Sequence, residues 1–333
     1  MQASLPVRLA ESLIDSVSYP VLTTGCVFFV PVMFLFIASG SIYPAPDIQP
    51  WGDNPLEITG VFLLIAILPA YLMMCFVAST RQLNNTHAAI SRLIDDVDEQ
   101  ERIRARGAGY WPLGVLLAAI FALGFNITWS TLSFNFADPR FAISACMVFG
   151  QVYLWAAVGL IVFHAIQQSM GLNQLGKQVR IDLYRLDDLN GFGRSSLNSF
   201  LMLVGALALT TLQSIDQTFR WENYANAFVV AIPAIFLIVP LPIWAIHLRI
   251  GDQKNALMAK LDEEIAQTSR ALETEALNRM NALLLRREQI HKLRTWPMDL
   301  SIVTRFLLYV FIPPLAWAGT ALMEVFLDNY LIG

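Results

Sequence analysis

Apolar and polar residues occur in long alternating blocks along the chain, and this pattern predicts membrane-spanning helices. A helix needs about 20 mostly apolar residues to cross a hydrocarbon layer about 30 Å thick. Seven stretches reach that length, at 19–40, 58–79, 112–135, 142–165, 197–216, 226–248 and 302–326. The fifth is the shortest and the most polar. The fold class expected is all-α, a polytopic membrane helix bundle with about seven transmembrane helices.

The remaining segments predict helices outside the hydrocarbon layer. In residues 1–18, Leu9, Leu13 and Val17 share one face, which is typical of an interfacial helix that precedes a membrane domain over 19–333. Three polar segments predict cytoplasmic helical extensions, at 80–110, 166–196 and 249–300. The irregular stretch 179–196 within the second is expected to be interfacial or a short amphipathic helix.

The segment 252–294 contains no glycine or proline, so it favours helix throughout. One straight helix of that length would extend about 65 Å. The residues from 293 to 300 could span only about 28 Å on the way back. We therefore expect a helical hairpin that turns near 267–273 and docks on a helix over 80–106. The alternative is a solvated linker without a partner.

The charged residues orient the predicted helices. Of 22 Lys and Arg residues, only Arg140 and Arg220 fall outside the predicted cytoplasmic segments and their membrane borders. Positive charge favours the cytoplasmic side, so the N-terminus is expected there and the C-terminus outside. Hydrophobic residues make up 56% of the chain and charged residues 14%, against about 25% charged in soluble domains. We expect a multi-pass protein of the plasma or inner membrane.

Motifs that identify a reaction are missing from the sequence. There is no HExxH, no GxSxG and no phosphate-binding glycine loop. Each of the cysteines, Cys26, Cys75 and Cys146, lies within an apolar stretch, where cysteine behaves as a small hydrophobic residue. We expect no catalytic residues, no cofactor, no metal site and no nucleic-acid partner.

Uncharged polar residues gather in the outer halves of the third, fourth and fifth stretches. Polar groups in lipid must face one another or a wet cavity. Their arrangement predicts an outward-opening pocket, with Asn126, Ser130 and Ser133 on one helical face and Trp129 on the wall. The candidate pocket residues are Asn126, Trp129, Ser130, Ser133, Gln151, Thr211 and Gln213. The alternative is hydrogen bonding that only holds the helices together.

Prolines and charges within the apolar stretches are the other candidate functional residues. Prolines bend or break helices, and the candidate hinges are Pro240, Pro242, Pro313 and Pro314. The candidate membrane-embedded charges are Arg305 and Glu324, near the two ends of the last stretch. Both can also reach water or headgroups by snorkelling. A carboxylate nearer the midplane would be expected in a proton-coupled transporter.

Two functions from different classes fit this pattern. The first is an oligomeric gated channel or ligand-responsive membrane protein. The layout of seven spans, an inside N-terminus and long inner helices is similar to that of the insect chemoreceptor channels, a resemblance of topology alone. The second is a non-conducting membrane scaffold whose cytoplasmic helices dock a protein partner. The expected partners are the lipid bilayer, further copies of the chain and a cytoplasmic protein. An enzyme acting on lipid ranks last.

Overall fold

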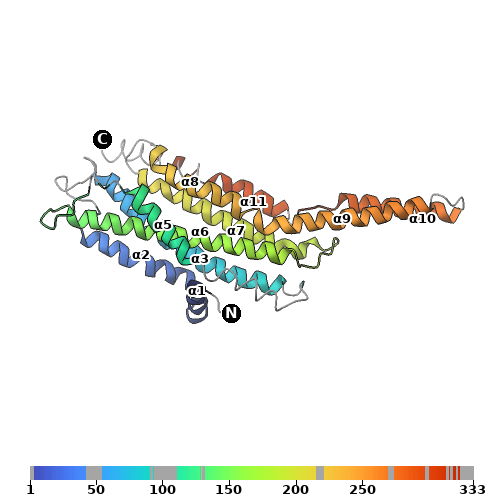
Figure 1. The fold of residues 1–333 in the computed structure, drawn as a ribbon, viewed down its shortest axis with the longest axis horizontal. Helices are drawn as coiled ribbons and strands as arrows, with labels where there is room; N and C mark the ends of the chain where they lie inside the picture. Colours follow the sequence, from blue (N-terminus) through green and yellow to red (C-terminus); the bar gives the residue numbers. More distant parts are fainter. Residues whose placement is uncertain are drawn as a thin grey trace.

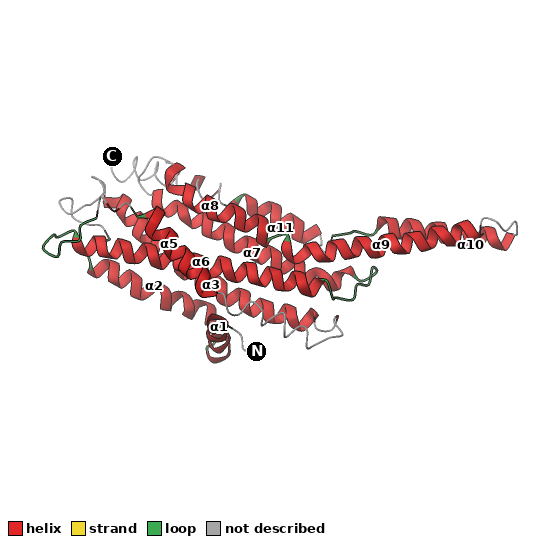
Figure 2. Ribbon diagram, viewed as in Figure 1, coloured by secondary structure: helices red, strands yellow, loops and turns green. Residues whose placement is uncertain are grey.

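The computed structural model describes residues 4–42, 55–90, 93, 111–127, 129, 132–214, 221–268, 274–296, 300–312, 315, 318, 319 and 322. Within these residues every regular element is helical (Figure 2). Five helical segments are long and apolar enough to cross a membrane: Pro20–Ala38, Ile58–Thr86, Phe141–Gly176, Leu186–Gln213 and Ala225–Thr268. A shorter apolar helical segment covers Trp111–Asn126. The all-α fold with several apolar helices of spanning length is thus confirmed.

Several of the described helices form an elongated bundle, in which most run roughly along one axis (Figure 1). They are α2 (Pro20–Ala38), α3 (Pro55–Ile90), α5 (Trp111–Phe121), α6 (Phe141–Gly176), α7 (Asn190–Leu209), α8 (Trp221–Ile238) and α11 (Leu300–Val310). The helix α1 (Leu5–Ser16) lies across the bundle at the start of α2. It packs through the buried Ala10 and the partly buried Val7 and Ile14.

Helix α3 lies inside the bundle and contacts α2, α6 and α7. It carries large side chains that are almost completely covered, such as Phe62 and Ile65. The ring of Phe62 packs edge to face on Phe36 of α2, with centroids 4.8 Å apart. A second apolar cluster, which includes Leu175, Phe192 and Ile246, lies where α6, α7 and α9 meet.

Helices α5 and α6 approach each other so closely that their backbones touch. A Cβ atom added to Gly159 would lie 2.4 Å from the carbonyl oxygen of Gly114 and 2.5 Å from Cβ of Ala118. Small residues at such crossings allow two membrane helices to pack backbone to backbone. Gly114 and Gly159 therefore fix the position of α5 against α6.

The helices α9 (Leu241–Thr268) and α10 (Thr274–Lys292) lie side by side and project from one end of the bundle (Figure 1). We call this end the hairpin end and the other the loop end. Lys254 Nζ donates to the carbonyl oxygens of His291 and Leu293, at 2.7 and 3.0 Å. The turn was expected near 267–273, of which 269–273 lie outside the described residues. The docking helix was expected over 80–106, of which 80–90 form the end of α3 and most of 91–106 lie outside the described residues.

The third apolar stretch departs from its prediction as one helix over 112–135. Helix α5 is followed by a π-helical turn, η3 (Ala122–Asn126), and the described residues from Ile127 to Asn135 are not in regular helix apart from Trp129. The backbone of Ile127 is extended, with φ −107° and ψ 120°. The run Ile127, Thr128 and Thr131 is β-branched and poorly suited to helix, which is a physical reason for the early end.

Candidate functional site

An internal cavity of about 130 Å³ lies between α3, α6, α7 and α8. Its α3 wall contains Val61, Leu64, Ile65, Leu68 and Leu72, residues spaced three or four positions apart that share one helical face. The other walls are also largely apolar, with Leu154 and Val158 from α6 and Leu203 from α7. We call this space the outer cavity because it lies toward the loop end.

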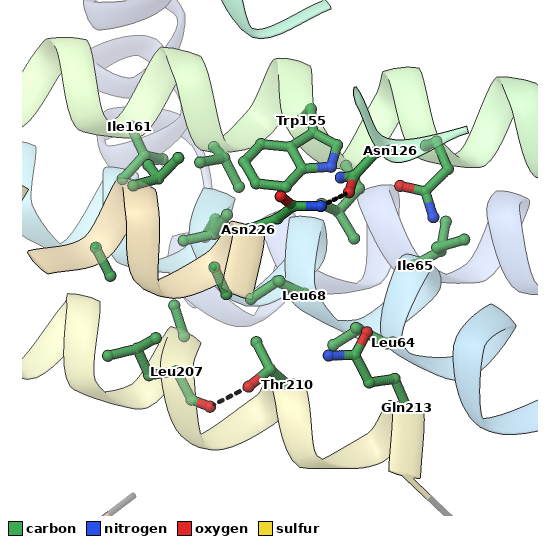
Figure 3. Close-up of a pocket in the computed structure, with 18 of the residues that line it drawn as sticks. Leu64, Ile65, Leu68, Asn126, Trp155, Ile161, Leu207, Thr210, Gln213 and Asn226 are labelled. Atoms are coloured by element: carbon green, nitrogen blue, oxygen red, sulfur yellow. Dashed lines mark hydrogen bonds between the residues drawn. The ribbon is translucent and has the colours of Figure 1, made fainter. Parts of the chain in front are cut away.

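Polar side chains gather at the loop end of the outer cavity (Figure 3). Asn126 comes from η3, Gln151 from α6 and Asn226 from α8. Thr210 and Gln213 come from η6 (Thr210–Ser214), a 3-10 turn that extends α7. Four carboxamides and one hydroxyl therefore face an otherwise largely apolar space, and none of the lining residues that the structure describes is charged.

Two of these carboxamides bond to each other across the bundle. Nδ2 of Asn226 donates to Oδ1 of Asn126, which connects α8 to the π-helical turn (Figure 3). Nε2 of Gln151 lies 3.8 Å from the Met147 sulfur, a weak acceptor. The hydroxyl of Thr210 donates to the Leu207 carbonyl at 2.6 Å. The amide pair leaves further N–H groups of Asn126 and Asn226 able to donate to a ligand.

Trp155 adds a donor to the outer cavity. Its side chain is 6% exposed, and its indole packs edge to face on Phe121 of α5, with centroids 4.8 Å apart. The buried Nε1–H has no hydrogen-bond partner among the described residues. In Figure 3 the nitrogen edge of the indole lies on the side of the Asn126–Asn226 pair. An indole nitrogen only donates, so this group is a buried donor whose hydrogen bond is unmade among the described residues.

Three of the predicted pocket residues, Asn126, Gln151 and Gln213, line the outer cavity. Thr211 is not among the lining residues, and its hydroxyl donates to the Ala208 carbonyl at 2.9 Å. The neighbouring Thr210 takes that place. The pocket is also wider than expected, since α3 and α8 contribute walls in addition to the third, fourth and fifth apolar stretches.

The prediction that Asn126, Ser130 and Ser133 share a helical face is wrong, since regular helix ends at Asn126. Ser133 instead lies in the loop, where its N–H donates to Ser144 Oγ at 3.0 Å. A hydrogen bond from the Ser133 side chain lowers the pKa of the Asp138 carboxyl. Ser130 lies outside the described residues.

Trp129 is not a wall of the outer cavity. Its side chain is 48% exposed, and its indole N–H donates to the Leu123 carbonyl at 2.9 Å. That bond satisfies one of the carbonyls left free where the helix ends. The residue therefore caps the end of the π-helical turn from outside, and the tryptophan of the cavity is Trp155.

The candidate hinge at Pro240 and Pro242 coincides with the break between α8 and α9. Pro242 lacks the N–H that would bond the Ile238 carbonyl in a continuous helix. The Ser169 hydroxyl of α6 donates to that carbonyl at 3.1 Å, and the Ser196 hydroxyl of α7 donates to the Val239 carbonyl. The neighbouring helices thus satisfy the groups that the break sets free.

The last apolar stretch contributes least to the described site. Arg305 is an exposed residue of α11. Pro313, Pro314 and Glu324 lie outside the described residues. Among the described residues, no group of three or more His, Cys, Asp and Glu side chains is placed to hold a metal ion.

Asn226 and Trp155 are the lining residues that sequence reasoning missed. Asn226 stands at the start of the sixth apolar stretch. Its position there, at the same expected depth in the membrane as Asn126, is the sequence signal that could have identified it. No sequence signal marks the indole of Trp155 as facing a cavity. No family model matches the chain, and the searches of curated proteins and of solved structures likewise found no match.

Proposed function

We propose that the chain is a seven-span, ligand-responsive membrane protein of the plasma or inner membrane, with its N-terminus and the α9–α10 hairpin in the cytoplasm. Five helical segments of spanning length support this, together with the shorter segment Trp111–Asn126 and the helix that starts at Leu300. The nearly one-sided placement of Lys and Arg supports the orientation.

The outer cavity is the binding site in this proposal, and the unpartnered indole N–H of Trp155 is the observation that carries it. A buried donor without a partner in an apolar surrounding is costly, by roughly 1–3 kcal/mol in typical proteins. Concave, mostly apolar pockets with a few directed polar groups are the usual form of small-molecule sites. The outer cavity has both features.

The lining defines the class of ligand. Its walls are largely hydrocarbon, so most of the ligand is apolar, and no described lining residue carries a charge that could neutralise one on the ligand. The amide groups of Asn126 and Asn226 and the indole of Trp155 present N–H donors at one end. The expected ligand is therefore a small neutral molecule with a hydrogen-bond acceptor, such as a ketone, ester or ether, that enters from the lipid phase.

A response to the ligand would pass through α8. This helix lines the outer cavity through Asn226, Ala227, Val230 and Ala231, and it ends at the proline break before α9. On the far side of the break, Arg249 of α9 donates to the carbonyls of Lys177 and Val179, at 2.7 Å each. A shift of α8 would change the angle at Pro240 while α9 stays tied to the end of α6.

Photoaffinity labelling of the purified protein tests the site. The probe is a neutral medium-chain ketone that carries a diazirine, and labelled peptides are identified by mass spectrometry. We expect labels on α6 and α8 residues of the outer cavity, removed by excess unlabelled ketone. Ala231→Leu fills the cavity, so labelling should fall at least fivefold. Val229→Leu, on the exposed side of α8, is the matched control and should label like the wild type.

Equal labelling of the Ala231→Leu and Val229→Leu variants would reject the outer cavity as the site. Label confined to exposed residues of α2 and α5 would show partition of the ketone into the annulus of lipid or detergent, and it would reject the proposal as well. The comparison of two leucine variants on one helix controls for effects of the substitution on hydrophobicity.

A non-conducting scaffold is the second candidate function, and the exposed leucines of the hairpin favour it. Leu277, Leu284 and Leu285 of α10 are 55%, 45% and 62% exposed, outside every predicted span. The far half of α9 carries Glu263 and Glu264, and α10 carries Arg279 and Arg286, whereas Asp262 and Arg287 pair within the hairpin. Two antiparallel hairpins could place α9 of one copy against α10 of another, so the partner proposed is a second copy of this chain.

A further inference from the structure

A second internal cavity, of about 280 Å³, lies between α3, α6 and α7. Its position follows from the direction of the helices, because all three contribute residues closer to the hairpin end than those of the outer cavity. We call it the inner cavity. Most of its lining surface is apolar, although seven of the lining residues carry a polar group: Tyr71, Cys75, Ser79, His164, Gln168, Asn198 and Ser199.

The two cavities follow one face of α6. From Gln151 to Gln168 this face lines first the outer and then the inner cavity. The distance along the helix axis is about 26 Å, at 1.5 Å per residue, which is most of a hydrocarbon layer about 30 Å thick. The cavities are therefore arranged in series across the bundle.

Ile161 separates the two cavities. It is a lining residue of both, and its side chain is 1% exposed. Leu72 of α3 and Leu203 of α7 line the adjoining end of the outer cavity, at 2% and 5% exposure. Apolar side chains from three helices thus lie between the inner cavity and the outer cavity.

One residue of the inner cavity, His164, has a buried polar atom without a partner among the described residues. This atom is Nε2 of the imidazole ring. Some of the neighbouring groups are satisfied by protein, since Ser199 donates to the Ser195 carbonyl and Asn198 to the side chain of Gln82. The cavity has room for several water molecules, each of which takes about 30 Å³ in the liquid. Water bonded to His164 would satisfy its ring nitrogen.

We infer that the two cavities form one path for water and small neutral polar solutes, closed at Ile161 by an apolar constriction. Narrow hydrophobic constrictions exclude water and act as gates in channels. No Asp, Glu, Lys or Arg lines either cavity in the part of the chain that the structure describes. The path therefore lacks the rings of charge that favour ions. This inference does not depend on a ligand in the outer cavity.

Osmotic water permeability of proteoliposomes tests the path. Ile161→Ala removes most of the constriction, so the permeability per protein should rise at least threefold over the wild type. Ile143→Ala is the matched control, because Ile143 is a buried isoleucine of the same helix that lines neither cavity. Equal permeabilities of the two variants would overturn the gate.

Chemical modification of Cys75 gives a second test of the path. In a Cys26→Ser, Cys146→Ser background it is the remaining thiol, and it lines the inner cavity. A neutral hydroxyethyl methanethiosulfonate at pH 9 should form a mixed disulfide there, with release of methanesulfinate, and should block the permeability of the Ile161→Ala protein. Cys75→Ser should remove the block.

A Cys75 that stays unmodified over hours in the folded background protein would show that the inner cavity is dry, and it would overturn the inference even if Ile161→Ala fails to fold. Modification without any loss of the raised permeability would show that water passes elsewhere. Labelling of the outer cavity by the ketone probe is a separate measurement, so the two proposals can fail separately.

Discussion

The bundle and the α9–α10 hairpin are both helical, but different interactions hold them. In the bundle, helices pack until backbones touch, as at Gly114 and Gly159, and large side chains such as Phe62 are completely covered. In the hairpin, Leu261 and Ile290 are buried, but the other described contacts are mainly exposed ion pairs and hydrogen bonds. In the bundle, the size and shape of each side chain must fit its neighbours. In the hairpin, residues need mainly to favour helix and to carry suitable charges.

The exposed apolar residues of the two regions also have different meanings. Phe34 of α2 and Ile120 of α5 are exposed on helices of the bundle, where lipid would cover them. Leu284 and Leu285 of α10 are exposed where lipid is not expected. The same fractional exposure is therefore ordinary in the bundle and indicates an interface in the hairpin.

Replacing one glycine by alanine in each region gives the largest expected difference in stability between the bundle and the hairpin. Gly159→Ala places a methyl group 2.4 Å from the Gly114 carbonyl oxygen, so α5 must move. Overpacking of this kind costs about 1–3 kcal/mol. Gly251→Ala in α9 meets nothing within 4 Å and should stabilise its helix by up to about 1 kcal/mol.

The two variants are compared by thermal unfolding in one detergent, followed by near-ultraviolet circular dichroism. We expect the midpoint of Gly159→Ala to fall and that of Gly251→Ala to hold or rise. If both midpoints fell equally, the close approach of α5 and α6 would not be the cause, and backbone packing would not distinguish the bundle from the hairpin.

Replacing the exposed leucines of α10 should have an intermediate effect, on assembly rather than on folding. If two hairpins pair, Leu277→Gln, Leu284→Gln and Leu285→Gln together should reduce the protein mass in detergent to that of one chain, 37.2 kDa. Light scattering with refractive-index correction for detergent measures this mass. Asn278→Gln and Asn281→Gln on the same helix are the control and should leave it unchanged. A wild type that is already a monomer would reject pairing.

The spanning helices were predictable because a stretch of about 20 mostly apolar residues is enough to indicate one. Five apolar stretches correspond to helical segments of spanning length, and their number and order need no knowledge of contacts. The hairpin prediction came from chain length, and α9 and α10 lie side by side where a single helix could not return. The orientation and the seventh span remain predictions.

The cavities were harder to predict because apolar residues lie on every face of the spanning helices. In α6 no polar stripe marks which side faces the bundle, so nothing in its sequence aims Trp155 or Ile161 at a cavity. The π-helical turn at Ala122–Asn126 also shifts the register of the following residues. Asn126 was found by its polarity, but its partner Asn226 depends on the packing of α8.

The smallest expected effect concerns an ion pair on the surface of α10. Glu288 Oε1 lies 2.7 Å from Lys292 Nζ, one turn further along. The hydrogen bond and the charge of Lys292 lower the pKa of Glu288 below the ordinary value for a glutamate. A carboxyl whose pKa is lowered on folding stabilises the helix above its unfolded pKa of about 4.3, and this stabilisation is lost as the pH falls through the lowered pKa.

Hydrogen exchange of the α10 amides measures this dependence, with rates corrected for the intrinsic effect of pH. In the wild type, protection near Glu288 should decrease slightly below about pH 4, relative to the amides of α6. Glu288→Gln cannot titrate, so its protection should lack the step at this site and start slightly lower at pH 7. Bundle amides should not respond to the substitution, because their protection depends on packing rather than on this charge. An equal step in the Gln variant would assign the acid sensitivity of the hairpin to other carboxylates, with Asp262 beside Arg287 as the next to test.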